Sequence, residues 1–109
     1  MYEKITAYIN IFDDASISEN DLKEKLKSFS DDFMQSGLMN PNAMEAMGDR
    51  MWASKESLKN DAPSMSADDV CVCLSAFVQQ DAFIPGILLD LVKQGVIPEM
   101  LKRLKALES

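Results

Sequence analysis

Three pairs of adjacent aspartates are the first residues of this 109-residue chain whose types could do chemistry. They are Asp13-Asp14, Asp31-Asp32 and Asp68-Asp69. Two carboxylates can hold a metal ion, or act as a general acid and a general base. Adjacent residues do not face one another on a helix, however, and acids in a first turn suit the helix dipole. We therefore interpret all three pairs as structural or solvated groups.

Nucleophiles and proton carriers are also sparse. The chain has no histidine, and its two cysteines are Cys71 and Cys73. Without histidine there is no Ser-His or Cys-His pair, and the four glycines stand singly, so there is no glycine-rich phosphate loop. Two positions apart on a helix means about 200° around its axis, so the two thiols cannot pair. We expect two buried thiols without a disulfide, and no catalytic residue, metal or cofactor.

Methionine is the least ordinary feature of the composition. The chain has eight methionines, and five fall within a short stretch: Met34, Met39, Met44, Met47 and Met51. Methionine is flexible, so it fills irregular gaps in a core and also covers adaptable binding surfaces. Two interpretations therefore stay open. Either these residues fill the core, or a partly exposed patch for another protein is formed by Met39, Met44, Met47, Met51 and Trp52, because tryptophan often anchors interfaces.

Charge is unevenly distributed along the chain. The formal net charge is -7, with an acid excess before residue 70 and a balanced segment after it. Direct nucleic-acid binding is not expected, because phosphate contacts need a basic surface. The acidic surface either serves solubility alone or docks on a basic partner. In the second interpretation Asp31 and Asp32 belong to the partner-binding face, together with the methionine and tryptophan patch.

Apolar residues recur at the spacing of helices along most of the chain. The predicted helices cover 3–12, run from 18 to 37, and begin near 40, 66, 85 and 98. Ser18 and Ser66, each followed three residues later by an aspartate, are typical N-caps. Asn40-Pro41 is expected to open the third helix, which Gly48 bends or breaks, and 60–64 is expected to be a loop.

These stripes predict an all-α fold, an orthogonal bundle of five or six short helices forming a single helical domain over residues 1–109. No convincing strand, repeat or heptad run is present. No unbroken apolar run approaches the length of about 20 residues that a membrane span needs. The start of the chain has no basic region followed by an apolar stretch, so we expect no secretory signal and a cytoplasmic location.

The last third of the chain carries a recognisable pattern. It consists of Leu74 to Gly86, then Gly95, then Leu101-Lys102-Arg103-Leu104. This stretch resembles the C-terminal third of an uncharacterised bacterial and phage family, a domain of unknown function with an Arg-x-x-Arg-Phe-x-x-Gly pattern, a later Gly and a Leu-x-Arg-Leu ending. The matching positions are Phe83, Gly86, Gly95, Arg103 and Leu104, while Gln79 and Ala82 replace the two pattern arginines. The resemblance implies an origin in bacteria or their mobile elements, and no activity.

Two classes of function follow from these observations. The first is a non-catalytic, acidic protein-binding module of bacterial or phage type. Its sharpest form is an inhibitor of a nucleic-acid-handling enzyme, for instance an anti-CRISPR-like protein, whose acids stand in for phosphates on a basic groove. The second is a small regulatory or assembly subunit, or an unrecognised enzyme. The expected partner is another protein with a basic surface, and a homodimer stays open.

Overall fold

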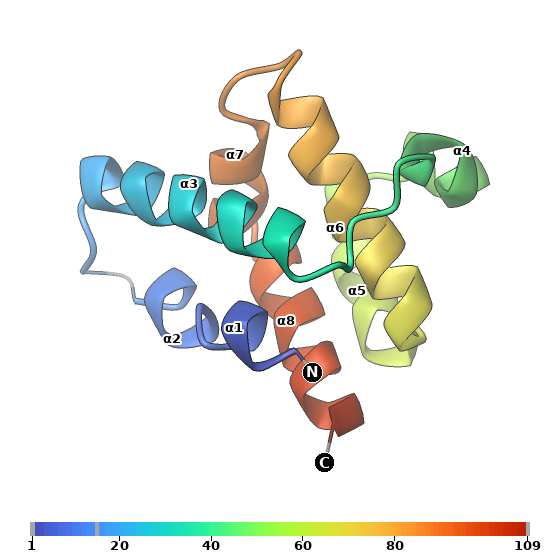
Figure 1. The fold of residues 1–109 in the computed structure, drawn as a ribbon, viewed down its shortest axis with the longest axis horizontal. Helices are drawn as coiled ribbons and strands as arrows, with labels where there is room; N and C mark the ends of the chain where they lie inside the picture. The colour runs from blue at the N-terminus through green and yellow to red at the C-terminus, as the bar shows by residue number, and fades with distance from the viewer. Residues whose placement is uncertain (1, 15, 109) are drawn as a thin grey trace.

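The protein is an all-α bundle of short helices, as the sequence predicts (Figure 1). The structure is a computed structural model that describes residues 2–14 and 16–108, and no strand occurs within those ranges. The α-helices are α1 (Glu3–Thr6), α2 (Ile9–Phe12), α3 (Glu19–Gln35), α4 (Ala43–Met47), α5 (Lys55–Asp61), α6 (Ala67–Asp81), α7 (Ile87–Lys93) and α8 (Val96–Glu108). Two 3-10 helices, η1 (Gly48–Trp52) and η2 (Ala62–Ser64), connect some of them.

The two longest helices begin where the sequence places them. The hydroxyl of Ser18 accepts a hydrogen bond from the Asp21 N–H at 3.1 Å at the start of α3. The hydroxyl of Ser66 accepts one from the Asp69 N–H at 3.1 Å at the start of α6. Each bond satisfies one of the N–H groups that a helix leaves without a partner in its first turn. Both predicted N-caps are therefore confirmed.

The N-terminal stripe is confirmed, but the single helix expected over 3–12 is wrong. The chain forms α1 and α2 with a turn between them, because the Tyr8 N–H bonds to the Ile5 carbonyl three residues back, at 3.1 Å. This tighter turn interrupts the α-helical bonding pattern. The apolar side chains of the stripe, Ile5, Tyr8, Ile9 and Phe12, are nevertheless all buried.

The middle of the chain needs two corrections. The third helix begins at Ala43, with Asn42 as its N-cap, rather than at Asn40-Pro41. The side chain of Asn40 instead accepts a hydrogen bond from the Asn42 N–H at 2.8 Å, which forms a local turn ahead of the helix. Gly48, at φ 56°, breaks the helix as expected. The predicted loop at 60–64 is wrong, since α5 and η2 continue through it.

The last two helices were expected to open at Pro85 and Pro98, and this prediction is wrong. Helix α7 begins at Ile87, two residues after Pro85 and directly after Gly86. Helix α8 begins at Val96, two residues before Pro98 and directly after Gly95. Gly86 and Gly95 have φ values of 96° and 85°, a left-handed conformation that other residues rarely adopt. Pro98 lies in the first turn of α8, where a missing N–H removes no helical hydrogen bond.

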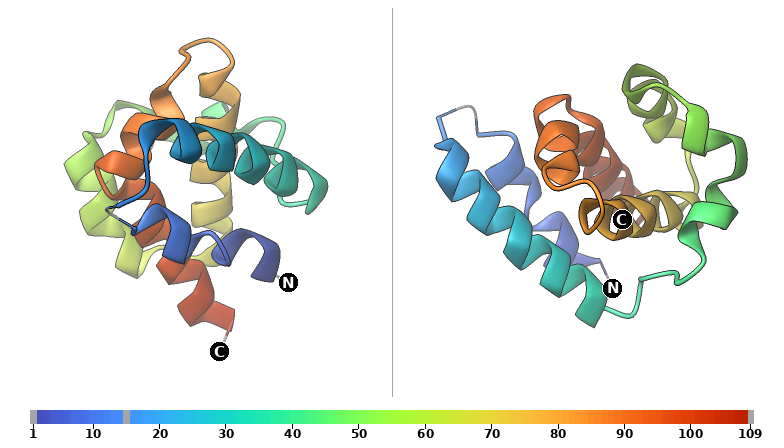
Figure 2. Two further views of the ribbon diagram at one scale, coloured as in Figure 1. Left: turned by 90° about the vertical axis from the view of Figure 1, so that its left-hand side faces the viewer. Right: turned by 90° about the horizontal axis from the view of Figure 1, so that it is seen from above.

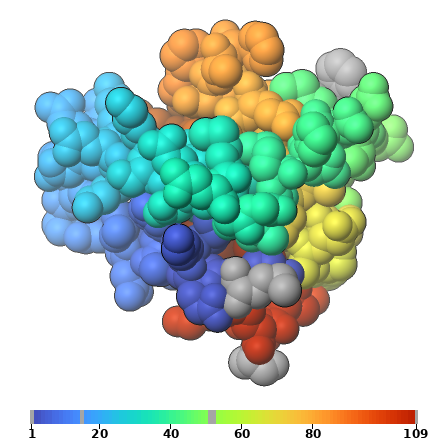
Figure 3. Space-filling model, in the orientation of Figure 1, coloured from blue at the N-terminus to red at the C-terminus, as the bar shows by residue number. Residues whose placement is uncertain are grey.

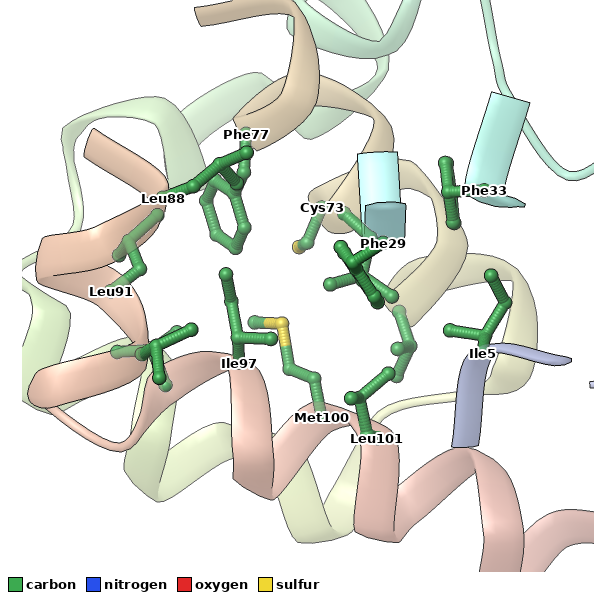
Figure 4. Packing of buried hydrophobic residues seen from close by; sticks show 14 of the residues in the cluster. Ile5, Phe29, Phe33, Cys73, Phe77, Leu88, Leu91, Ile97, Met100 and Leu101 are labelled. Atoms are coloured by element: carbon green, nitrogen blue, oxygen red, sulfur yellow. The ribbon is translucent and has the colours of Figure 1, made fainter. Parts of the chain in front are cut away.

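One hydrophobic core joins the helices, and α8 runs through it. Helix α8 contacts α1, α2, α5, α6, α7 and η2, and its side chains Ile97, Met100, Leu101 and Leu104 are fully buried. Figure 4 shows Phe29 from α3 and Cys73 and Phe77 from α6 pointing into the same space. Helices α3 and α7 also pack directly on each other, so their relative position is set by the fold.

Candidate protein-binding surface

The methionine segment is mostly a lining of the core. Met47 is buried and belongs to the core cluster, while Met39 and Met44 are half-buried against it. Met47 borders a small hollow of about 150 Å³ between η1, α5, α6 and α7. The side chains of Met51 and Trp52 lie outside the described residues. The structure therefore supports the gap-filling interpretation for Met47.

Residues 38–40 are held to α6 by two polar side chains. The fully buried hydroxyl of Ser75 accepts a hydrogen bond from the Asn40 N–H at 2.9 Å and donates to the Cys71 carbonyl at 2.7 Å. The amide of Gln79 donates to the Asn40 carbonyl at 2.8 Å and approaches the sulfur of Met39 at 3.5 Å. These bonds fix the position of Met39 beside the core.

Asp31 and Asp32 are adjacent on α3 but have different surroundings. Asp32 is half-buried and accepts a hydrogen bond from the Tyr8 hydroxyl at 2.7 Å. Burial and this bond raise the pKa of Tyr8 to about 12. Asp31 is exposed and borders a groove on the other side of the helix. The two predicted site residues thus do not act as one pair.

The other aspartate pairs are also divided between separate partners. Asp13 forms an ion pair with Lys102 at 3.0 Å, whereas Asp14 accepts hydrogen bonds from Ser16. Asp69 lies 3.6 Å from Arg50 and, like Asp68, occupies the first turn of α6. Within the described residues no group of three or more His, Cys, Asp or Glu side chains is placed to hold a metal ion.

Much of the acidity has a local structural explanation. More than half of the 18 acidic residues lie in the first turn of a helix, where the peptide dipoles favour negative charge. A chain cut into many short helices has many such positions. Most of the acidic residues are therefore placed where helices begin.

The two cysteines are buried and free, as predicted. Burial raises the pKa of both the Cys71 and the Cys73 thiol to about 11. A thiol with such a pKa is almost entirely protonated at neutral pH, and the thiolate is the reactive form. Neither side chain has the environment of a nucleophile.

Among the described residues, the two most exposed large apolar side chains belong to consecutive residues between α6 and α7. Phe83 is 79% exposed and Ile84 is 58% exposed. They belong to the apex loop, by which we mean residues 82–86, and Figure 3 shows this orange segment projecting above α3. The two other large exposed apolar residues, Met34 and Leu107, are on α3 and α8. Only the apex loop has two such residues in succession among the described residues.

A groove adjoins the apex loop. It has a volume of about 570 Å³ and lies between α3 on one side and the apex loop with the start of α7 on the other. Figure 2 shows α3, in cyan, running beside the orange α7 when the molecule is seen from above. Its lining combines apolar and charged residues, namely Lys23, Leu26, Lys27, Ser30, Asp31, Asp81, Pro85, Gly86, Leu88 and Leu89. Groove and exposed loop together form one continuous surface, because Pro85 and Gly86 belong to both.

Sequence reasoning missed Phe83 and Ile84 as site residues. The signal was present, because both lie beyond the apolar stripe of α6 and immediately before Pro85-Gly86, where a turn is expected. Apolar residues placed in a turn have no helix face that would direct them to the core. Their exposure, however, depends on how α7 packs, which the sequence pattern does not contain.

Two of the recognised C-terminal positions have structural roles. The side chain of Arg103 donates a hydrogen bond from Nε to the Met65 carbonyl at 2.7 Å, which joins α8 to the start of α6. Gly95 has the left-handed conformation described above, between α7 and α8. Comparison with known proteins adds no relative: no family model, curated protein or solved structure matches this chain. The helices of the described residues are all too short or too polar to cross a bilayer.

Proposed function

We propose that this protein is a non-catalytic binding module that docks on another protein through the apex loop and the adjoining groove. The observation that carries this proposal is the exposure of Phe83 and Ile84 as neighbours on a projecting loop. Burying an apolar side chain of this size typically stabilises a protein by about 1.5–3 kcal/mol. Two such side chains left in water are a source of binding energy for a partner that covers them.

The groove supports the same proposal. Scattered exposed apolar residues are normal, and Met34 and Leu107 need no partner. Phe83 and Ile84 differ because they adjoin a concavity with apolar residues at its base and charged residues at its edge. An apolar centre with a polar rim is the usual anatomy of a protein–protein interface.

A narrower form of the proposal is an inhibitor of a nucleic-acid-handling enzyme, of the anti-CRISPR-like kind. What supports it is the small size and the net charge of -7. The acids are spread over the helix starts, so the apex loop is a stronger candidate for the docking surface than an acidic face. A regulatory or assembly subunit would use the same surface, and the identity of the captured partner separates the two.

The proposal is tested by photocrosslinking in cells. A photoreactive amino acid is placed at residue 83, and a control protein carries it at Leu107, which is 40% exposed on α8. We expect a discrete crosslinked protein from position 83 and none of the same mass from position 107. Pull-down of the captured partner is then compared for two matched variants, Phe83→Ser/Ile84→Ser and the control Met34→Ser/Leu107→Ser.

Loss of capture with the first variant only is the expected result, with circular dichroism confirming that both variants remain helical. Equal capture by both variants, or crosslinks from both positions to the same proteins in similar amounts, would overturn the proposal. The apex loop would then be an exposed turn without a docking role.

A further inference from the structure

The charges along the groove have an order that the proposed docking function does not by itself require. Lys23, Lys27 and Asp31 are four residues apart on α3, so they follow one another on one side of the helix. With a rise of about 1.5 Å per residue, Lys23 and Asp31 are separated by about 12 Å along the axis. The groove therefore has a positive end and, two turns away, a negative one.

The lysines at the positive end have no ion pair among the described residues. No ion pair joins Lys23 or Lys27 to a described carboxylate, although Lys55, Lys93 and Lys102 each have one. Glu19, which lies one turn before Lys23 on the same side of α3, is bound to Lys93 at 2.7 Å. Lys23 contributes only a smaller part of the lowering of the Glu19 pKa, behind Lys93.

The acid at the negative end of the groove is likewise open to a charged ligand. Asp31 is exposed and has no ion pair with a described residue. The other acid of the groove, Asp81, is half-buried, and one of its carboxylate oxygens accepts hydrogen bonds from the N–H groups of Gly86 and Leu88, at 3.2 and 3.3 Å. Asp31 is therefore the more exposed of the two acids that a ligand of the groove can reach.

Between the two ends the groove is apolar. Leu26 of α3 and Leu88 of α7 are buried beneath it, and Leu89 is half-buried at its side. The described residues contain no strand, so a partner has no sheet edge to extend here. An amphipathic helix laid with its apolar face in a groove is an established recognition mode for a peptide segment, and it fits an apolar groove between helices.

Resting on the proposed docking function, we propose that the groove takes an amphipathic helical segment of the partner with a dipolar charge pattern. Its apolar stripe lies on Leu26, Leu88 and Leu89. Its acidic end lies against Lys23 and Lys27, and a basic residue about two turns away lies against Asp31. The partner is thus neither uniformly basic nor uniformly acidic where it enters the groove.

Three synthetic peptides of 14 residues provide the probe. They share one leucine stripe at helical spacing and differ in their charged positions, which are all Glu, all Lys, or Glu at one end and Lys at the other. Binding of each labelled peptide to the full chain is followed by fluorescence anisotropy at low salt. We expect the dipolar peptide to bind about fivefold more tightly than either uniform one, the effect of a few partly exposed ion pairs.

Charge variants of α3 then reverse the preference. In Lys23→Glu/Lys27→Glu the groove is acidic throughout, so the all-Lys peptide should bind most tightly. In Asp31→Lys the side of the groove formed by α3 is basic throughout, so the all-Glu peptide should bind most tightly. Equal affinities for the three peptides, an order unchanged in the variants, or no binding of any peptide would overturn this inference.

The proposed function can survive that result. Phe83→Ser/Ile84→Ser leaves the three charges of α3 and the leucines of the groove in place, so the order of the three peptide affinities should not change. A partner captured at residue 83 while no peptide binds would leave the apex loop as the docking site and remove the groove. Peptide binding that needs Lys23 and Lys27 but no captured partner would support the groove chemistry and contradict the cellular role of the loop.

Discussion

The Asp81 carboxylate accepts a hydrogen bond from the Leu88 N–H at 3.3 Å, which joins the last residue of α6 to the first turn of α7. The same oxygen accepts a bond from the Gly86 N–H at 3.2 Å. Together the two bonds close the apex loop at its base and supply the cap that Gly86 itself cannot offer. The exposed Phe83 and Ile84 therefore lie on a loop whose two ends are joined by hydrogen bonds.

Removing this carboxylate should loosen the loop. Asp81→Ala is expected to lower the free energy of unfolding by about 1 kcal/mol, the usual loss for a helix cap. Hydrogen exchange of the Gly86 and Leu88 amides should accelerate, because both lose their acceptor. Partner binding should weaken as well, although no apolar contact has been removed, since a looser loop must be ordered on binding.

Asp61→Ala serves as the control for that variant. Asp61 is an exposed acid at the end of α5, and no described contact involves its carboxylate. Its replacement should leave stability and amide exchange in the apex loop unchanged. If Asp81→Ala behaves like Asp61→Ala, the two bonds do not organise the loop.

Replacing Asp31 and replacing Asp32, the adjacent acids of α3, should have different effects on the free energy of unfolding. Tyr8→Phe and Asp32→Ala each break the hydrogen bond between Tyr8 and Asp32, and each should cost about 1–2 kcal/mol. Asp31→Ala, one residue away and exposed, should be within about 0.5 kcal/mol of the parent. Urea denaturation of the three variants measures this, and a loss in Asp31→Ala equal to that in Asp32→Ala would contradict it.

Replacing the buried Ser75 should lower the free energy of unfolding more than replacing an exposed serine. Ser75→Ala removes the acceptor of the Asn40 N–H and is expected to cost about 1–3 kcal/mol, because that donor is left without a partner. Ser28→Ala, at an exposed position in the middle of α3, should cost nothing, since alanine favours a helix. Thermal melts of both variants check the difference. Equal melting temperatures would mean that residues 38–40 are held by other contacts.

The sequence predicts best what is decided locally. Ser18 and Ser66 cap α3 and α6 because the hydroxyl and the N–H that it accepts from are three residues apart. Gly48 breaks its helix for a similarly local reason, its positive φ. The helical stripes also identify most of the core, including Phe29 and Phe33.

Features that depend on distant parts of the chain could not be predicted in this way. Asn40 was expected to cap a helix, but its backbone is held by Ser75 and Gln79 on α6, and the helix begins after it. The apex loop is another case. Phe83 has the same residue type as the buried Phe77, but Phe77 lies on the apolar side of α6 whereas Phe83 lies in the loop after it.

The last prediction concerns alkaline pH. Burial raises the pKa of the Cys71 and Cys73 thiols to about 11, from an ordinary value of 9.0 in the unfolded chain. Between these values the folded state holds more protons than the unfolded state does. Stability from this source is therefore fully present below about pH 9 and is lost as the pH rises through 11, with each unit of pKa shift worth about 1.4 kcal/mol at most.

Melting curves of the parent and of Cys71→Ala/Cys73→Ala between pH 7 and pH 11 isolate the thiols. The double variant should be less stable at pH 7, because it loses buried volume, yet its stability should fall less steeply above pH 9. Tyr8, whose pKa is raised to about 12, contributes to the slope in both proteins and so cancels in the comparison. Parallel curves for the two proteins would show that the thiols ionise as readily in the folded chain as in the unfolded one, and would contradict their burial in α6.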